Sequence, residues 1–207
     1  MRVFRSIQDY VSFIAQSPLL QGELFCFSYI PSAFFPKDVV QYYFQHKDVT
    51  SEHLAIANSL WKFGRRMLSD LGQGRIRIAV EYSALRAFVE RGVVHKASSN
   101  FEATIATRIS VLNTFLKLMD SIYFLPEPAP YIFRLTPPDR IIIDVDNNNV
   151  GQTVQGLTFN DSSSYVAFAE EFDRLAQASR LAYPLEAIIA SLRNVRDNLT
   201  KGAPVLM

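Results

Sequence analysis

The middle of the chain carries runs of apolar residues separated by turn-forming residues. Two runs rich in Ile, Phe, Leu and Val, residues 131–136 and 140–145, flank Pro137, Pro138 and Asp139. Such runs, bounded by Pro, Asn and Asp, are typical of strands joined by turns. A third strand is expected over residues 150–159, before a helix capped within Ser162–Ser164. The pattern therefore predicts a meander of three strands that leads into an amphipathic helix.

Helical spacing of apolar residues dominates the segments on both sides of this meander. Apolar residues recur every three or four positions in amphipathic helices, whereas they alternate in half-buried strands. This spacing predicts helices over residues 3–14, 36–44, 50–72, 81–91, 100–119, 162–176 and 184–199, and strands over 22–30, 75–80 and 122–125. The order of these elements predicts an α+β fold: a mixed or antiparallel sheet that amphipathic helices cover mainly on one side.

We expect one domain over residues 1–207. Residues 1–72 form a helical N-terminal portion with one strand, residues 73–180 a sheet-containing core, and residues 181–207 a C-terminal helix and tail. Apolar residues make up 49% of the chain and charged residues 20%, which is typical of a folded protein. The 16 Phe and 9 Tyr fill an aromatic core, or some of them line a ligand cavity or a subunit interface.

The net charge and the cysteine content limit which cellular compartment and which binding partners are expected. The formal net charge of +1 gives no general electrostatic attraction to nucleic acid or to an anionic membrane. The single cysteine, Cys26, lies in an apolar run, so we expect a buried thiol, no internal disulfide and no cysteine zinc site. Charges recur too often near Met1 for a signal peptide, and no run approaches the roughly 18 apolar residues of a membrane span. We expect a soluble, cytoplasmic protein.

Motifs of catalysis and cofactor binding do not occur in the sequence. The eight glycines form neither a phosphate-binding loop nor a dinucleotide fingerprint, and no Gly-x-Ser-x-Gly elbow is present. His46 and His53 are seven residues apart, but residues 48–50 interrupt a helix between them, and Lys96 follows His95 one position too early for a His-x-Lys motif. We therefore expect no enzyme activity, no cofactor and no metal.

Two acidic residues at the end of a predicted strand allow two interpretations. Asp144 and Asp146 flank Val145 and share one face of the strand, where they could bind a divalent cation. The three asparagines that follow, residues 147–149, favour a hairpin turn instead, because Asx side chains bond to turn amides and tolerate left-handed backbone. An enzyme would require a histidine beside both carboxylates.

Glu81 is the preferred candidate for ligand binding. It ends a predicted buried strand and precedes a helix, and the carboxyl end of a strand is where α/β sheets place ligand contacts. Arg86 either forms an ion pair with Glu81 or binds an anionic ligand group. The residues expected to surround such a ligand are Glu81, Tyr82, Arg86, Tyr42, Tyr43 and Trp61.

Basic residues gather on one predicted helix and the strand after it. The set consists of Lys62, Arg65, Arg66, Arg75 and Arg77. Together they either contact phosphates or form an ordinary solvated face. No helix-turn-helix spacing accompanies them, so direct contact with nucleic acid is not expected from this chain alone.

Two stretches resemble bacterial regulatory domains. Residues 30–36, 59–68 and 78–86 resemble, in that order, the effector domains of Xre-type helix-turn-helix regulators, in which an Arg-rich helix precedes a strand ending in Glu-x-x-Leu-Arg. Residues 133–179 look like the closing half of non-catalytic phospholipase D-like domains of regulators. The matching motifs are Gly156-Leu-Thr-Phe and Phe172-Asp-Arg-Leu175. The catalytic histidines and lysines of phospholipase D enzymes are missing, so the resemblance implies binding or sensing without hydrolysis.

The expected function is a non-enzymatic regulatory domain that binds a small ligand or a partner protein and is tied to transcriptional control. The alternative is a protein-interaction subunit of an oligomeric complex, without a small-molecule pocket, whose surplus aromatic residues form a subunit interface. In both cases a protein partner or self-association is expected, and a membrane is not.

Overall fold

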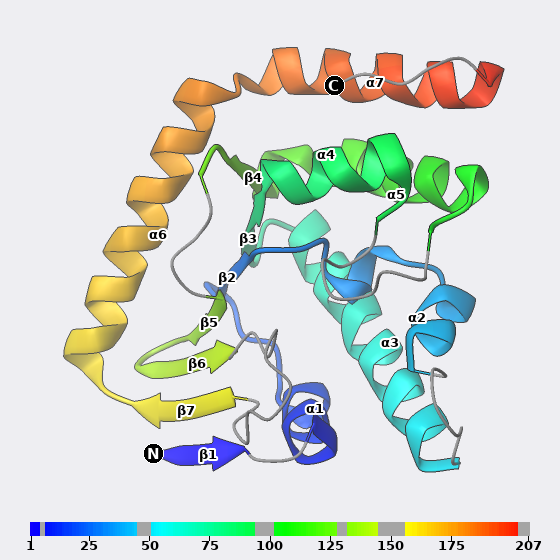
Figure 1. The fold of residues 1–207 in the computed structure, drawn as a ribbon. Coiled ribbons are helices and arrows are strands. Elements are labelled where there is room, and N and C mark those ends of the chain that lie inside the picture. Colours follow the sequence, from blue (N-terminus) through cyan, green and yellow to red (C-terminus); the bar gives the residue numbers. More distant parts are fainter. Residues whose placement is uncertain (5–6, 45–50, 94–101, 128–131, 145–155, 203–207) are drawn as a thin grey trace.

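A mixed sheet forms the centre of the protein. The computed structural model describes residues 1–4, 7–44, 51–93, 102–127, 132–144 and 156–202. In this part of the chain, seven strands lie in the order β1-β7-β6-β5-β2-β3-β4 (Figure 1). They are β1 (Arg2–Phe4), β2 (Leu24–Phe27), β3 (Arg77–Glu81), β4 (Ile122–Leu125), β5 (Ile132–Thr136), β6 (Arg140–Asp144) and β7 (Gly156–Asn160). The prediction of an α+β fold with a mixed sheet and a meander is confirmed.

The sheet has a parallel half and an antiparallel half. Strands β2, β3 and β4 are parallel to one another, and helices connect each to the next. Strand β5 pairs antiparallel with β2, and β6, β7 and β1 continue the antiparallel pairing to the other edge. The carboxyl ends of β2, β3 and β4 therefore lie at the same edge of the sheet as the start of β5 and the end of β6.

Helices cover both faces of the sheet, so the prediction of cover mainly on one side is wrong. Helix α6 (Ser162–Ala182) lies along one face (Figure 1). The opposite side carries α1 (Ile7–Gln16), η1 (Ser32–Phe34), α2 (Lys37–Phe44), α3 (Ser51–Gly72), α4 (Tyr82–Arg91) and α5 (Ile105–Leu118). After η2 (Met119–Ser121) and the meander, α7 (Leu185–Lys201) turns from the end of α6 to pack on α5. The physical reason is that both crossovers of the parallel half place their helices on one face, and α6 then returns over the other.

Strand alternation divides the core between these two faces. Phe133, Leu135 and Ile141 pack with Phe172 and other residues of α6. Neighbouring strand positions such as Phe25, Ile78 and Val80 point the other way, into the larger cluster formed with α3, α5 and α7. We call these the α6 face and the α1/α3 face.

The N-terminus departs from the predicted helix over residues 3–14. Val3 belongs to strand β1, where it pairs with Leu157 of β7, and the helix begins only at Ile7. The described part of the first 72 residues therefore contains two strands, whereas one was predicted. Pairing with a strand more than 150 residues away is a tertiary effect that local apolar spacing does not report.

Two other boundaries bear on the predictions. Helix α5 begins at Ile105, and the side chain of Thr104 caps it by accepting a hydrogen bond from the Thr107 amide. Residues 100 and 101, with which the predicted helix begins, lie outside the described residues, as do His46, His95 and Asp146. Gly92 ends α4 as predicted, in the left-handed conformation with φ 74°. Among the helices that the structure describes, none has the length and apolar character needed to cross a membrane.

Candidate functional site

Glu81, the preferred sequence candidate, is buried on the α6 face. It is the last residue of β3, and its side chain is 2% exposed. The Ser83 hydroxyl donates a hydrogen bond to Glu81 Oε2 at 3.3 Å. Alternation along β3 places Glu81 on the same face as Ala79, which belongs to the cluster under α6. The carboxylate thus lies at the predicted edge of the sheet, but it is covered.

Tyr82 and Arg86 have partners other than Glu81. The Tyr82 ring stacks on the ring of Tyr183, between α6 and α7, with centroids 4.3 Å apart. Burial raises the pKa of the Tyr82 hydroxyl above its usual value, and the neighbouring Tyr183 adds to this shift. Arg86 is exposed and pairs along its own helix with Glu90, from Nε to Oε1 at 2.9 Å. The expected Arg86–Glu81 pair is therefore not the pair that Arg86 forms.

Trp61 is on the other side of the sheet from Glu81. It is half-buried on α3 and packs against the cluster of the α1/α3 face. The Lys37 ammonium and the Arg65 guanidinium lie 5.8 Å and 5.5 Å from its ring centroids, as cation–π contacts. The side chains of Tyr42 and Tyr43 lie outside what the structure describes. The structure thus brings Glu81 and Tyr82 near one edge but does not bring Trp61 to them.

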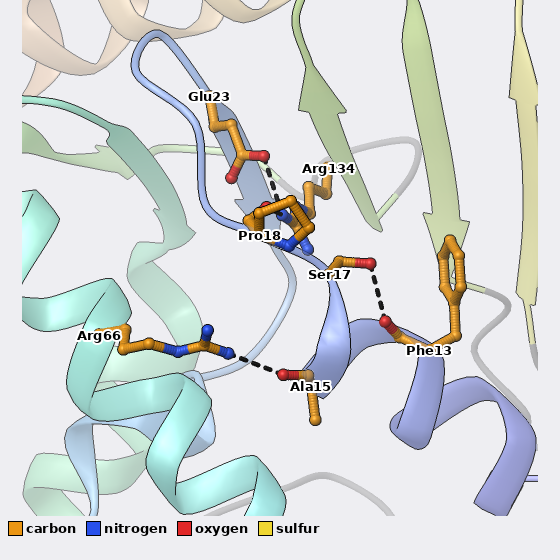
Figure 2. A network of polar contacts seen from close by, with 7 residues as sticks. All are labelled: Phe13, Ala15, Ser17, Pro18, Glu23, Arg66 and Arg134. Atoms are coloured by element: carbon orange, nitrogen blue, oxygen red, sulfur yellow. Dashed lines mark hydrogen bonds and ion pairs between the residues drawn. The ribbon is translucent and has the colours of Figure 1, made fainter.

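Most of the predicted basic set binds the protein itself. Arg65 donates to the carbonyls of Ala33 and Phe35, and Arg66 Nη2 donates to the Ala15 carbonyl at 2.7 Å (Figure 2). Arg75 pairs with Asp70 at 3.5 Å, and Arg77 pairs with Asp173 at 2.8 Å. These contacts hold η1, the end of α1 and helix α6 to neighbouring elements, which accounts for the arginines without a phosphate ligand.

Sequence reasoning missed a buried ion pair between Glu23 and Arg134. Their side chains are 0% and 5% exposed, and Arg134 Nη2 lies 2.8 Å from Glu23 Oε1. The same nitrogen donates to the Pro18 carbonyl at 2.8 Å, just after α1 (Figure 2). The Arg134 guanidinium also lies 5.4 Å from the ring centroids of both Phe25 and Phe63. The signal in the sequence was an arginine inside the apolar run of β5.

Burial of this ion pair carries a large desolvation free energy. Removing an ion from water costs several kcal/mol, and apolar pairs of similar volume are often at least as stable. Glu23 Oε2, Arg134 Nε, Arg134 Nη1 and Thr136 Oγ1 have no hydrogen-bond partner although all four atoms are buried. The register of β2 and β5 places Glu23 opposite Thr136, so these atoms belong to neighbouring residues. We infer that the pair fixes the position of the chain after α1 more than it adds net stability.

Asp144 continues the polar side chains along the same face. It is the half-buried last residue of β6, and Tyr29 Oη donates to its Oδ2 at 3.3 Å. The Tyr10 ring of α1 lies against Gly156, the cross-strand partner of Asp144, which brings its hydroxyl beside this carboxylate. Burial, followed by the charge of Asp144, raises the pKa of that hydroxyl, and the charge of Arg134 opposes the shift. We call Glu23, Thr136, Arg134, Tyr10, Asp144 and Tyr29 the polar row.

The metal hypothesis for Asp144 finds no support in the described part of the chain. No group of three or more His, Cys, Asp and Glu side chains gathers there in a way that would hold a metal ion. Asp144 instead accepts a hydrogen bond from Tyr29 and lies beside Tyr10. The partner carboxylate of the hypothesis, Asp146, and residues 147–149 lie outside the described residues.

The chain matches no protein-family model, no curated protein and no solved structure.

Proposed function

We propose that this protein is a non-enzymatic, cytoplasmic regulatory domain, tied to transcriptional control, that binds a small polar ligand at the Asp144 end of the polar row. The observation that carries the proposal is the position of the Tyr10 ring, which lies against Gly156, the cross-strand partner of Asp144. Tyr10 thereby places helix α1 beside a half-buried carboxylate at the sheet edge. A ligand that bonds to Asp144 competes with Tyr10 and thereby changes how α1 is held.

The position of Asp144 supports a binding role. Asp144 pairs with Ile132, the first residue of β5, so it lies at the edge formed by the carboxyl ends of β2, β3 and β4. Open sheets with parallel strands bind ligands at this edge. The half-buried Tyr29, which follows β2, adds a hydroxyl and an aromatic ring at the same place.

The order of elements supports a regulatory role. The chain runs from β5 through a turn to β6, then to β7 starting at Gly156, and then to α6 with Phe172 and Leu175 buried. This is the order of the non-catalytic phospholipase D-like regulatory domains that the sequence resembles. A glycine is required at position 156 because a Cβ there would lie 2.5 Å from Tyr10 Cε2.

A thermal-shift screen of the whole chain against polar metabolites tests the binding site. A ligand of the proposed site stabilises the native chain and Asp173→Asn, an exposed matched control, but not Asp144→Asn or Tyr10→Phe. Hits that stabilise all of these variants equally contradict the site. A hit that is lost in Glu81→Gln and in Arg86→Ala would instead move the site to the residues first expected from the sequence.

A protein-interaction subunit is the second candidate. It is favoured by two large apolar side chains that α6 presents to solvent, Val166 at 52% and Leu181 at 77% exposure. Light scattering of the native chain and of Leu181→Ser tests it. Self-association that Leu181→Ser abolishes favours this candidate, whereas a monomer at all concentrations contradicts the self-associating form.

A further inference from the structure

Buried polar side chains gather where the segment after α1 meets strands β2 and β5. They belong to Ser17, Glu23, Arg134 and Thr136 (Figure 2). The Ser17 hydroxyl is satisfied, because it donates to the Phe13 carbonyl at 2.7 Å. In the described part of the chain, Glu23 Oε2, Arg134 Nε, Arg134 Nη1 and Thr136 Oγ1 have no hydrogen-bond partner. Buried polar groups in folded proteins are nearly always hydrogen-bonded, so these four atoms require a partner.

The Arg134 guanidinium forms its hydrogen bonds to the described residues through Nη2. This nitrogen donates to Glu23 Oε1 and to the Pro18 carbonyl, each at 2.8 Å, which uses both of its N–H groups. The rings of Phe25 and Phe63 lie 5.4 Å from the guanidinium. A ring face attracts the positive charge but offers no lone pair to the N–H groups in the guanidinium plane. The N–H groups of Nε and Nη1 therefore still need acceptors.

Backbone hydrogen bonds hold both charged residues inside the protein. The Glu23 carbonyl accepts from the Arg77 amide at 3.1 Å, and the Glu23 amide donates to the Leu20 carbonyl at 3.4 Å. Arg134 lies on β5, which pairs with β2 on one side and with β6 on the other. The side chains of Glu23 and Arg134 are 0% and 5% exposed. A partner for the unpaired atoms must therefore be buried together with them.

The charges and the hydrogen-bonding groups at this place select the kind of partner. Glu23 Oε2 needs a donor, Nε and Nη1 of Arg134 need an acceptor, and the Thr136 hydroxyl can do either. The guanidinium would repel a cation and the carboxylate would repel an anion, because the two charged groups lie 2.8 Å apart. A neutral group that both donates and accepts satisfies all of these atoms. Water is such a group, and it is small enough to lie among packed side chains.

We propose that Glu23, Arg134 and Thr136 form an internal water-binding site between α3, β2 and β5. At least one bound water accepts from the Arg134 guanidinium and donates to Glu23 Oε2, and the Thr136 hydroxyl is a further partner. The water replaces part of the hydration that both charges lose on folding, which explains how the ion pair persists among apolar side chains. The site is independent of the proposed function, because that ligand binds at the Asp144 end of the polar row.

Oxygen-17 relaxation dispersion of solvent water, measured on the full chain, tests whether long-lived internal water is bound there. The double variant Glu23→Leu with Arg134→Met removes both charged partners, so its dispersion amplitude should be smaller than that of the native chain by at least one long-lived water. Arg86→Ala breaks an exposed ion pair and serves as the control, with an unchanged amplitude. Equal amplitudes in the native chain and the double variant overturn the proposal.

A second measurement locates the water in the native chain, so it remains informative if the double variant folds poorly. We expect a nuclear Overhauser effect between water and the Arg134 Nε–H group, with the sign that a long-lived bound water gives. Thr136→Val removes the hydroxyl and should weaken this signal, whereas Thr136→Ser keeps the hydroxyl and should retain it. A native chain without the signal contradicts the site, and so does a signal of equal strength in the two Thr136 variants.

Discussion

Substitution of Gly156 by alanine tests the packing of α1 on the sheet. A Cβ at this position would lie 2.5 Å from Cε2, 2.8 Å from Cδ2 and 3.0 Å from Cζ of Tyr10. Real Cβ atoms do not tolerate contacts below 3.0 Å, so the ring must move. The ring is 8% exposed, its hydroxyl lies beside Asp144, and Phe4 packs beside it, so movement of the ring disturbs both contacts.

The expected cost follows from two opposing effects. Forcing an extra carbon into packed surroundings costs about 1–3 kcal/mol. Alanine regains about 0.4–1 kcal/mol by restricting the unfolded chain, because Gly156 does not have a positive φ in the folded protein. We therefore expect Gly156→Ala to lower the free energy of unfolding by about 1–2 kcal/mol.

Urea denaturation followed by circular dichroism measures this cost. The control is Gly72→Ala, where the new Cβ meets the mobile end of a side chain, Leu118 Cδ2, at 3.2 Å, so the loss should be smaller. In a Tyr10→Leu background, Gly156→Ala should cost nothing, because the clashing ring is gone. If the cost persists in that background, or equals that of Gly72→Ala, the packing of Tyr10 on Gly156 is refuted.

Three further predictions concern charges. Glu23→Gln leaves the buried Arg134 without a charged partner and should lower the free energy of unfolding by about 3–5 kcal/mol. The double variant Glu23→Leu with Arg134→Met should lose much less stability. Urea denaturation measures both losses, and equal losses contradict the ion-pair argument. Burial raises the pKa of the Cys26 thiol to about 12. The stability that the neutral thiol contributes is therefore complete below the unfolded pKa near 9 and is lost as the pH rises toward 12. Cys26→Ala should reduce the loss of stability measured between these pH values, and an unchanged slope of stability against pH contradicts the prediction. Arg86→Ala should leave the urea midpoint unchanged, because its pair with Glu90 is exposed, and a large shift would show a role that this pair does not explain.

Local patterns in the sequence were sufficient for much of the fold. The turn between β5 and β6 and the helices α3, α4, α6 and α7 lie where apolar spacing and Gly92 place them, but Asp161, not a residue of Ser162–Ser164, caps α6. The sequence did not reveal that β1 pairs with β7 or that helices cover both faces. Both depend on which distant segments meet, and local periodicity carries no information on that.

The candidate site was predicted less well, for a related reason. The position of Glu81 at the carboxyl edge was expected, but its burial on the α6 face depends on how α6 packs. Arg134 and Glu23 are 111 residues apart, so their pairing was not visible in the linear chain. Arg134 still gave a signal, since a charge inside an apolar strand needs a buried partner.

The link between the sheet edge and α1 is the central claim, and a double-mutant cycle on Tyr10→Phe and Asp144→Asn tests it most directly. If the Tyr10 hydroxyl bonds to the Asp144 carboxylate, the two substitutions are not additive, and urea denaturation yields a coupling energy of about 1.5–3 kcal/mol. Additive losses, with a coupling energy near zero, would contradict the link and with it the proposed route from ligand to helix.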